Sequence, residues 1–190
     1  MKNKKILRVL IPSVVVLALA IGFIAFGAGR SGALTPDAAR RPDGVPADGV
    51  VIIDPNLTAL AGELEGTAES KAAAKAALDE INSTRSAAGL STLSWSNGLE
   101  QASSVRAVEA AQVWSHTRPD GTEYWTVNSN LVYGENLAKG YNSASGAFSA
   151  WMASPSHKDN ILFGDFRTAA IAVHIDSKTG QWFWANEFGY

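Results

Sequence analysis

The chain has 190 residues and no cysteine, so its folded part must be stabilised by a core without disulfides. The formal net charge of -2 conceals an uneven distribution. The first 30 residues carry five basic residues and no acid, which leaves 11 basic and 18 acidic residues after them, a balance of -7. Because phosphate binding needs a basic face, this acidic body argues against nucleic acid as a partner.

Residues 1–29 have the composition of a membrane anchor. A basic cluster precedes an apolar run over residues 9–29, which is broken only by Pro12 and Ser13. These 21 residues are long enough to cross a bilayer and exceed the apolar part of a typical signal peptide. We expect an uncleaved N-terminal helix in the cell membrane with the rest of the chain outside. Cleavage of a signal peptide within residues 31–33 is the alternative, and it would make the protein secreted.

Residues 30–66 have the composition of a flexible linker. They are rich in Pro, Gly, Asp and Ala, with turn-forming RPDG and PADG segments. The apolar exception is residues 50–53 (VVII), which is either a short strand that docks on the domain or part of the tether. The domain itself is expected over residues 67–190.

The domain begins with a predicted helix over residues 68–88, which are rich in Ala, Lys and Glu. Leu78, Ile81 and Arg85 share one face of this helix, and Gly89 is the expected C-terminal stop. That face is therefore predicted to pack against the core.

The remaining elements follow in chain order. Ser96 or Asn97 is expected to cap a second helix that reaches about Val113, with an apolar stripe that includes Leu99 and Val105. The later segments comprise a loop at 117–133, a short helix at 145–153, a strand at 168–175, a hairpin loop at 176–180 and a strand at 181–188. Helices first and an antiparallel pair last predict an α+β class, with helices packed on a small antiparallel sheet.

Three polar motifs carry the possible chemistry. His116 lies in SHTRPDG (115–121), Glu135 in GENLA (134–138), and His157 in WMASPSHKDNIL (151–162). If the fold brings these three side chains together, they form a polar pocket able to hold a divalent metal ion or a small ligand.

The same motifs resemble those of the CAP superfamily, named after cysteine-rich secretory proteins, antigen 5 and pathogenesis-related 1 proteins. The helix segment INSTR (81–85), the two histidine motifs, the glutamate motif and the closing segment 182–189 are similar to its signatures in the expected order. The resemblance covers residues 70–190 and has a bacterial form. It implies the CAP domain, also called the SCP domain, which is a three-layer α-β-α sandwich with a polar central cavity.

The chain departs from the family pattern in its cavity residues. Eukaryotic members usually place two histidines and two acids there, and the position of the second acid is Ser154 in this chain. Glu187, on the closing strand, is a candidate to replace the missing acid. The strand glycines common in the family are replaced by Ala170 and Ala172.

The candidate pocket has two interpretations. Two imidazoles and a carboxylate could hold Zn²⁺ or another divalent cation and leave a position for water, so that His116, Glu135 and His157 become candidate catalytic groups. Alternatively, Glu135 accepts backbone hydrogen bonds that lock a turn, and both histidines bond to loop carbonyls in a network without chemistry.

Other polar and aromatic residues have simpler expected roles. Ser154 and Ser156 are expected to cap the turn near His157 rather than to act as nucleophiles. His174 is expected at a surface or strand edge, and Trp125 is the best candidate for a surface contact.

Three functions are compatible with the sequence. The first is an exported, membrane-tethered domain that binds a small ligand, lipid, metal, protein or cell-wall component. The second is a zinc-dependent hydrolase of peptide or cell-wall polymer, which the missing second acid disfavours because such an acid usually serves as general base. The third is a structural or adhesive surface protein.

Overall fold

The computed structural model describes residues 39–41 and 64–190 of the chain. The chain divides into two units, Met1–Ser31 and Gly32–Tyr190, and all described residues belong to the second. The expected anchor at 1–29 and the apolar segment 50–53 therefore lie outside the described residues. Within the described part, none of the helices has the length and apolarity that crossing a membrane requires.

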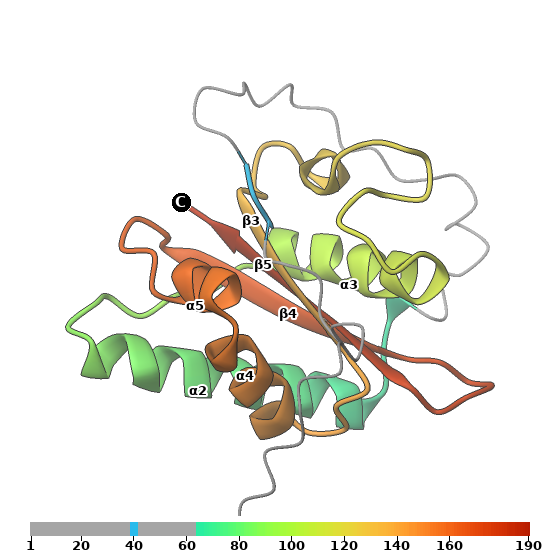
Figure 1. Ribbon diagram of the computed structural model, residues 1–190, viewed down its shortest axis with the longest axis horizontal. Coiled ribbons are helices and arrows are strands. Elements are labelled where there is room, and N and C mark those ends of the chain that lie inside the picture. The colour runs from blue at the N-terminus through green and yellow to red at the C-terminus, as the bar shows by residue number, and fades with distance from the viewer. Residues whose placement is uncertain (1–38, 42–63) are drawn as a thin grey trace, which may run out of the picture. The chain divides into compact units, whose positions relative to one another are not determined.

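The described residues form a three-layer sandwich, as the sequence predicted (Figure 1). Helices α2, α4 and α5 pack on one face of a sheet, and helix α3 packs on the other. The helices are α2 (Ala68–Ala87), α3 (Asn97–Gln112), the 3₁₀ turn η2 (Tyr124–Val127), α4 (Ala144–Ala153) and α5 (Pro155–Ile161). The strands are β1 (Ala39–Arg40), β2 (Ser94–Trp95), β3 (Gly134–Lys139), β4 (Thr168–Ile175) and β5 (Trp182–Gly189).

The sheet has five strands in the order β1-β3-β5-β4-β2, and it is mixed rather than purely antiparallel. The pairs β1–β3, β3–β5 and β4–β5 are antiparallel, whereas the short β2 runs parallel to β4. The sequence analysis expected the β4–β5 hairpin but not the other three strands. It placed Glu135 in a turn at most, and this is wrong: Glu135 lies within β3, opposite Glu187 of β5 and Ala39 of β1.

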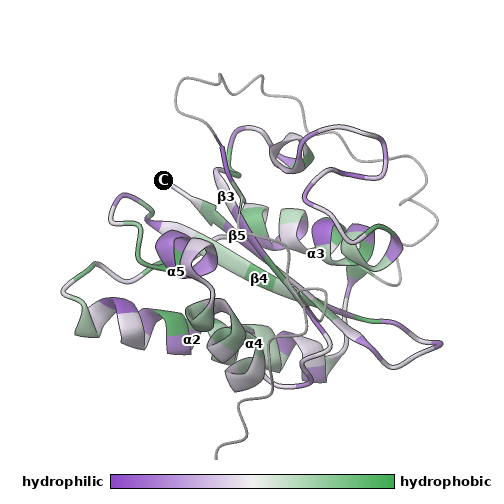
Figure 2. Ribbon diagram, viewed as in Figure 1, coloured by the Kyte–Doolittle hydropathy of each residue, from purple (hydrophilic) through white to green (hydrophobic). Residues whose placement is uncertain are grey.

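Helix α2 confirms the predicted face and both predicted ends. Leu78, Ile81 and Arg85 are buried, and the helix ends before Gly89. Thr67 and Ser70 form a reciprocal capping box at the start, with hydrogen bonds of 2.9 and 3.0 Å. Figure 2 shows the resulting alternation of hydrophilic and hydrophobic segments along α2.

Buried Arg85 ties this helix to the loop before β4. Its guanidinium group donates hydrogen bonds to the carbonyl oxygens of Ile161, Phe163 and Phe166, at 2.7, 2.9 and 3.2 Å. Because a buried guanidinium group must have its donors satisfied, this arrangement fixes the chain between α5 and β4 in one position.

The described part of the expected linker contributes a strand to the sheet. Ala39 and Arg40 pair with Glu135 and Gly134, and the Nη1 atom of Arg41 donates to the carbonyl oxygen of Ser129 at 2.7 Å. The guanidinium group of Arg40 lies 4.4 Å from the centre of the Phe163 ring. The composition of residues 30–66 did not predict these contacts, because β1 is only two residues long.

Candidate functional site

Glu135 is the centre of a buried polar network on the α3 side of the sheet. Its side chain is fully buried and accepts hydrogen bonds from Arg106, from Nε at 2.7 Å and Nη2 at 3.1 Å. His116 Nδ1 lies 2.6 Å from the other carboxylate oxygen, so Nδ1 carries the hydrogen that it donates. The structure therefore brings two of the three predicted site residues into direct contact.

Arg106 and Glu109, one turn apart on α3, extend this network. Arg106 Nη1 lies 2.5 Å from a carboxylate oxygen of Glu109, and Arg118 Nη2 donates to the other oxygen of Glu109 at 2.7 Å. All three side chains are buried. Two cations thus alternate with two carboxylates, which offsets the cost of removing each charge from water.

Arg106 also fixes the loop that carries His116. Its Nη2 atom donates to the carbonyl oxygen of Ser115 at 2.9 Å, while the Tyr124 ring packs edge-on against the imidazole with centroids 6.1 Å apart. The His116 side chain is 19% exposed, so it forms the solvent-facing end of the network.

The charge state of Glu135 follows from these contacts. Burial alone would raise the pKa of its carboxyl group, but the charge of Arg106 and the hydrogen bonds from His116 and Arg106 outweigh burial and lower the pKa to about 2. Glu135 is therefore ionised at neutral pH. A carboxylate held by a guanidinium group in this way is a poor general base and a poor metal ligand.

Glu187 lies directly opposite Glu135 in the β3–β5 pair and is also fully buried. Burial and the adjacent negative charge of Glu135 raise the pKa of Glu187 well above its ordinary value. Glu187 is thus a neutral carboxylic acid beside an ionised one. The candidate that the sequence analysis named for the missing acid does reach the network.

His157 is placed by a different set of contacts. It lies on α5 and is 1% exposed, and its carbonyl oxygen accepts a hydrogen bond from Asn136 Nδ2 at 3.0 Å. Asn136 follows Glu135 on β3, and successive side chains of a strand point to opposite faces. His157 therefore belongs to the helical layer on the face of the sheet opposite Arg106 and α3.

The arrangement does not fit a metal centre with three protein ligands. Among residues 39–41 and 64–190, no group of three or more His, Asp or Glu side chains is arranged to hold a metal ion. Both oxygens of Glu135 are already bonded to Arg106 or His116. The prediction of zinc or another divalent cation at His116, Glu135 and His157 thus stays a prediction from the sequence.

Ser154 is the N-cap residue of α5, but within the described chain its side chain makes no capping hydrogen bond. Pro155 instead occupies the first turn, and the Oγ atoms of Ser154 and Ser156 lie 3.4 Å apart. The expectation that Ser154 caps this turn through its hydroxyl group is wrong.

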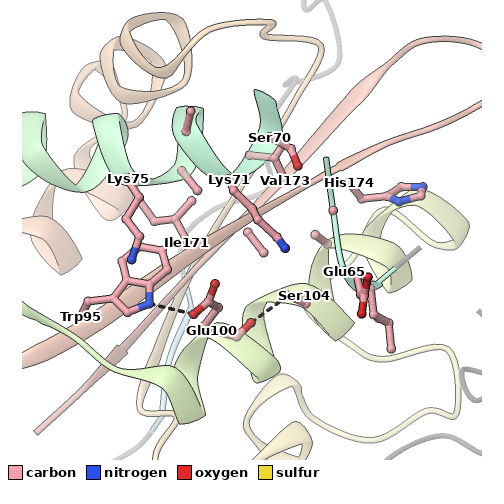
Figure 3. Close-up of a pocket in the computed structure, with 16 residues that line it drawn as sticks. Glu65, Ser70, Lys71, Lys75, Trp95, Glu100, Ser104, Ile171, Val173 and His174 are labelled. Carbon is pink, nitrogen blue, oxygen red and sulfur yellow. Dashed lines mark hydrogen bonds between the residues drawn. The ribbon is translucent and has the colours of Figure 1, made fainter. Parts of the chain in front are cut away.

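A groove of about 250 Å³ lies between α2 and α3 along the outer edge of β4 (Figure 3). Its floor is apolar and includes Ile171, Val173 and Ala74, while Lys71 and Lys75 of α2 line one wall and Glu100 and Ser104 of α3 line the other. His174, which is 9% exposed, lines it at the strand edge where the sequence analysis expected it.

Trp95 closes one end of this groove. Its Nε1 atom donates to Glu100 at 2.9 Å, and the Lys75 ammonium group lies 3.6 Å from its ring centre. By contrast, Trp125, the expected surface residue, is partly buried and packs against Tyr124 with ring centroids 5.2 Å apart.

Sequence reasoning missed both the groove and the cations of the network. Arg106 and Glu109 lie in an Ala-rich helix where the apolar stripe was the feature examined. Their i, i+3 spacing was the available signal, because such pairs lie on one helix face. The groove residues are scattered over four segments, so no sequence motif marks them.

Comparison with known proteins identifies the family. Residues 78–188, more than half of the chain, match the sequence profile of the cysteine-rich secretory protein family, CAP. The chain belongs to this family. A search of curated protein sequences found no match.

Solved structures have the same CAP fold. An outer surface protein of Borrelia burgdorferi matches with a TM-score of 0.56 and 22% identity, over 63% of this chain and 93% of that chain. An extracellular protein containing an SCP domain from Bacillus anthracis matches with a TM-score of 0.54 and 19% identity, over 64% of this chain. The second match covers 41% of the Bacillus chain. At these identities the likeness concerns the fold.

Proposed function

We propose that this CAP domain is an exported binding module that takes a small, elongated ligand in the groove beside β4. The observation that carries the proposal is the groove itself, about 250 Å³ in volume, with an apolar floor and charged walls. Ligand sites are typically concave and apolar with a few polar groups that fix orientation. The lysines of α2 favour a ligand that carries at least one anionic group.

The polar network around Glu135 is better explained as a scaffold than as a reaction centre. Arg106 bonds to Glu135, Glu109 and the loop of His116 at the same time. A network satisfied in this way rigidifies the packing of α3 on the sheet. This supports binding over hydrolysis, because a hydrolase needs a free base or an open metal position.

Export and tethering are part of the same proposal. The basic cluster and 21 apolar residues of segment 1–29 favour a membrane anchor with the CAP domain outside. The two similar structures are named as an outer surface protein and an extracellular protein, which supports a location outside the cytoplasm. Protease treatment of intact cells should digest the domain if this is correct, and a protected domain would contradict it.

The ligand can be sought in protein purified from the host that makes it. We expect native mass spectrometry of the full chain to show a bound small molecule that Ser104→Trp removes, because the larger side chain fills the groove. The matched control is Ser149→Trp, at an exposed position of α4 that does not line the groove.

The outcomes separate the three functions. Loss of the ligand in Ser104→Trp alone supports the groove, whereas equal retention in both variants contradicts it. A chain without any bound or added ligand favours the structural or adhesive alternative. Stoichiometric zinc uptake in calorimetry, abolished by His116→Ala or His157→Ala, would revive the zinc hydrolase and overturn the scaffold interpretation.

A further inference from the structure

The outer edge of β4 is covered over only part of its length. Strand β2 pairs with Thr168 and Ala169, and within the described chain no strand pairs with the outer edge from Ala170 to Ile175. An open strand edge presents backbone N–H and C=O groups that can pair with another chain, and proteins usually block such edges. Here the edge forms the floor of the groove.

The hydrogen bonds of β2 identify which residues present these groups. The amide of Ser94 donates to the carbonyl oxygen of Arg167 at 2.9 Å, and the amide of Ser96 donates to that of Ala169 at 3.1 Å. The outward-pointing backbone groups of a strand recur at every second residue. The next ones therefore belong to Ile171, Val173 and Ile175.

The hollow surface follows this edge for most of its length. The groove includes residues 171–174, and an adjoining pocket of about 220 Å³ extends it past Ser70 and Thr67 to Ile175 and Ser177. At about 3.3 Å per residue, the distance from Ile171 to Ile175 accommodates an extended segment of about five residues.

The charges on the walls add a preference for an acidic group. Lys75 and Glu100 are both engaged with Trp95. Lys71, in contrast, makes no ion pair within the described part of the chain, and its ammonium group points into the groove (Figure 3). A carboxylate placed above β4 would find a cation there.

From these observations we propose that the ligand is an extended peptide segment of another protein, bound as an additional strand on the β4 edge. Its backbone pairs with Ile171 and Val173, alternate apolar side chains contact the groove walls, and an acidic side chain pairs with Lys71. A peptide supplies both the donors and the acceptors that a strand edge requires, whereas a lipid tail supplies neither. The inference rests on the proposed binding function of the groove.

The test uses the full chain in lipid nanodiscs and a pooled library of octapeptides. Each peptide carries one Asp and has Val, Ile, Thr, Leu or Phe at alternating positions. We expect retained peptides, identified by mass spectrometry, whose affinity falls at least tenfold with Lys71→Glu. The matched control Lys158→Glu reverses an exposed charge on α5 and should change the affinity less than twofold.

Backbone methylation of the best peptide tests the strand geometry. Methylating every second amide on one edge of the peptide should abolish binding, while methylating the alternate set should not, since only one edge faces β4. Hydrogen exchange at the amides of Ile171 and Val173 should slow in the bound chain.

Two results would overturn the inference. One is the absence of any retained peptide, and the other is equal binding by both methylated sets. If native mass spectrometry still finds a ligand that Ser104→Trp removes, the binding function survives and the peptide proposal alone fails. If neither peptides nor any other ligand occupies the groove, both proposals fail together.

Discussion

At the scale of single residues, Glu187 makes stability depend on pH in an unusual direction. Its raised pKa means that it stays protonated in the folded chain at a pH where the unfolded chain has ionised it. Folding therefore takes up a proton above the unfolded pKa, and the free energy of unfolding falls as the pH rises toward the folded pKa.

The variant Glu187→Gln should remove this dependence while preserving the shape of the neutral acid. We expect the variant to gain on the natural chain by up to about 1.4 kcal/mol per pH unit above pH ~4.5, measured by urea unfolding from pH 4 to 8. Below that range the two chains should converge. Parallel curves over the whole range would show that Glu187 ionises normally in the folded chain.

Arg106 is the residue on which the polar network depends most. Arg106→Met would leave Glu135 and Glu109 without the cation that lies between them. Leaving charges buried without their partner typically costs about 3–5 kcal/mol, so we expect a loss of that size in urea unfolding. Arg167→Met, at an exposed position, is the control and should cost less than about 1 kcal/mol. A small effect of Arg106→Met would contradict the scaffold role.

At the scale of elements, the end of β5 is packed too closely for a side chain. A Cβ atom at Gly189 would lie 2.7 Å from the carbonyl oxygen of Leu131 and 2.8 Å from Thr168 Oγ1. Because the first neighbour is backbone, Gly189→Ala should destabilise the domain by roughly 1–3 kcal/mol.

The matched substitution Gly164→Ala tests whether this cost comes from local crowding. At Gly164 the nearest atom to an added Cβ is a Leu90 methyl carbon at 3.8 Å, an ordinary contact. We expect its melting temperature to stay close to that of the natural chain and that of Gly189→Ala to fall. Equal shifts would indicate a general effect of glycine replacement.

The elements that the sequence predicted correctly are those with a strong local signal. Helix α2 has good helix formers and a glycine after its end, and strand β4 matches its predicted bounds, 168–175. Strand β3 has no such signal. Its residues are buried on both faces except at Lys139, so they do not alternate between apolar and polar, and Gly134 and Asn136 are poor strand formers.

The site was predictable to the same limited extent. The glutamate and histidine motifs placed His116 beside Glu135 only through their resemblance to a family. The pairing of Glu135 with Arg106 depends on α3 crossing the sheet, and the open edge of β4 depends on β2 ending after two residues. Both are consequences of tertiary structure that local sequence patterns do not encode.

At the scale of the whole molecule, the described CAP domain separates structural and binding roles between two places. The network around Glu135 joins α3 to the centre of the sheet and is satisfied by its own members. The groove lies at the opposite edge of the sheet from β1, where β4 is left open between α2 and α3. A domain with this division can bind a ligand without any reaction at its histidines.

The most direct test compares the affinity of the recovered ligand for Ser104→Trp and for His116→Ala. Both variants would be measured beside the natural chain by isothermal titration calorimetry, with circular dichroism to confirm folding. We predict that Ser104→Trp loses binding at least tenfold, whereas His116→Ala binds within about twofold of the natural chain even if its stability falls. Loss of binding in His116→Ala with full binding in Ser104→Trp would contradict the account and return the site to the polar network.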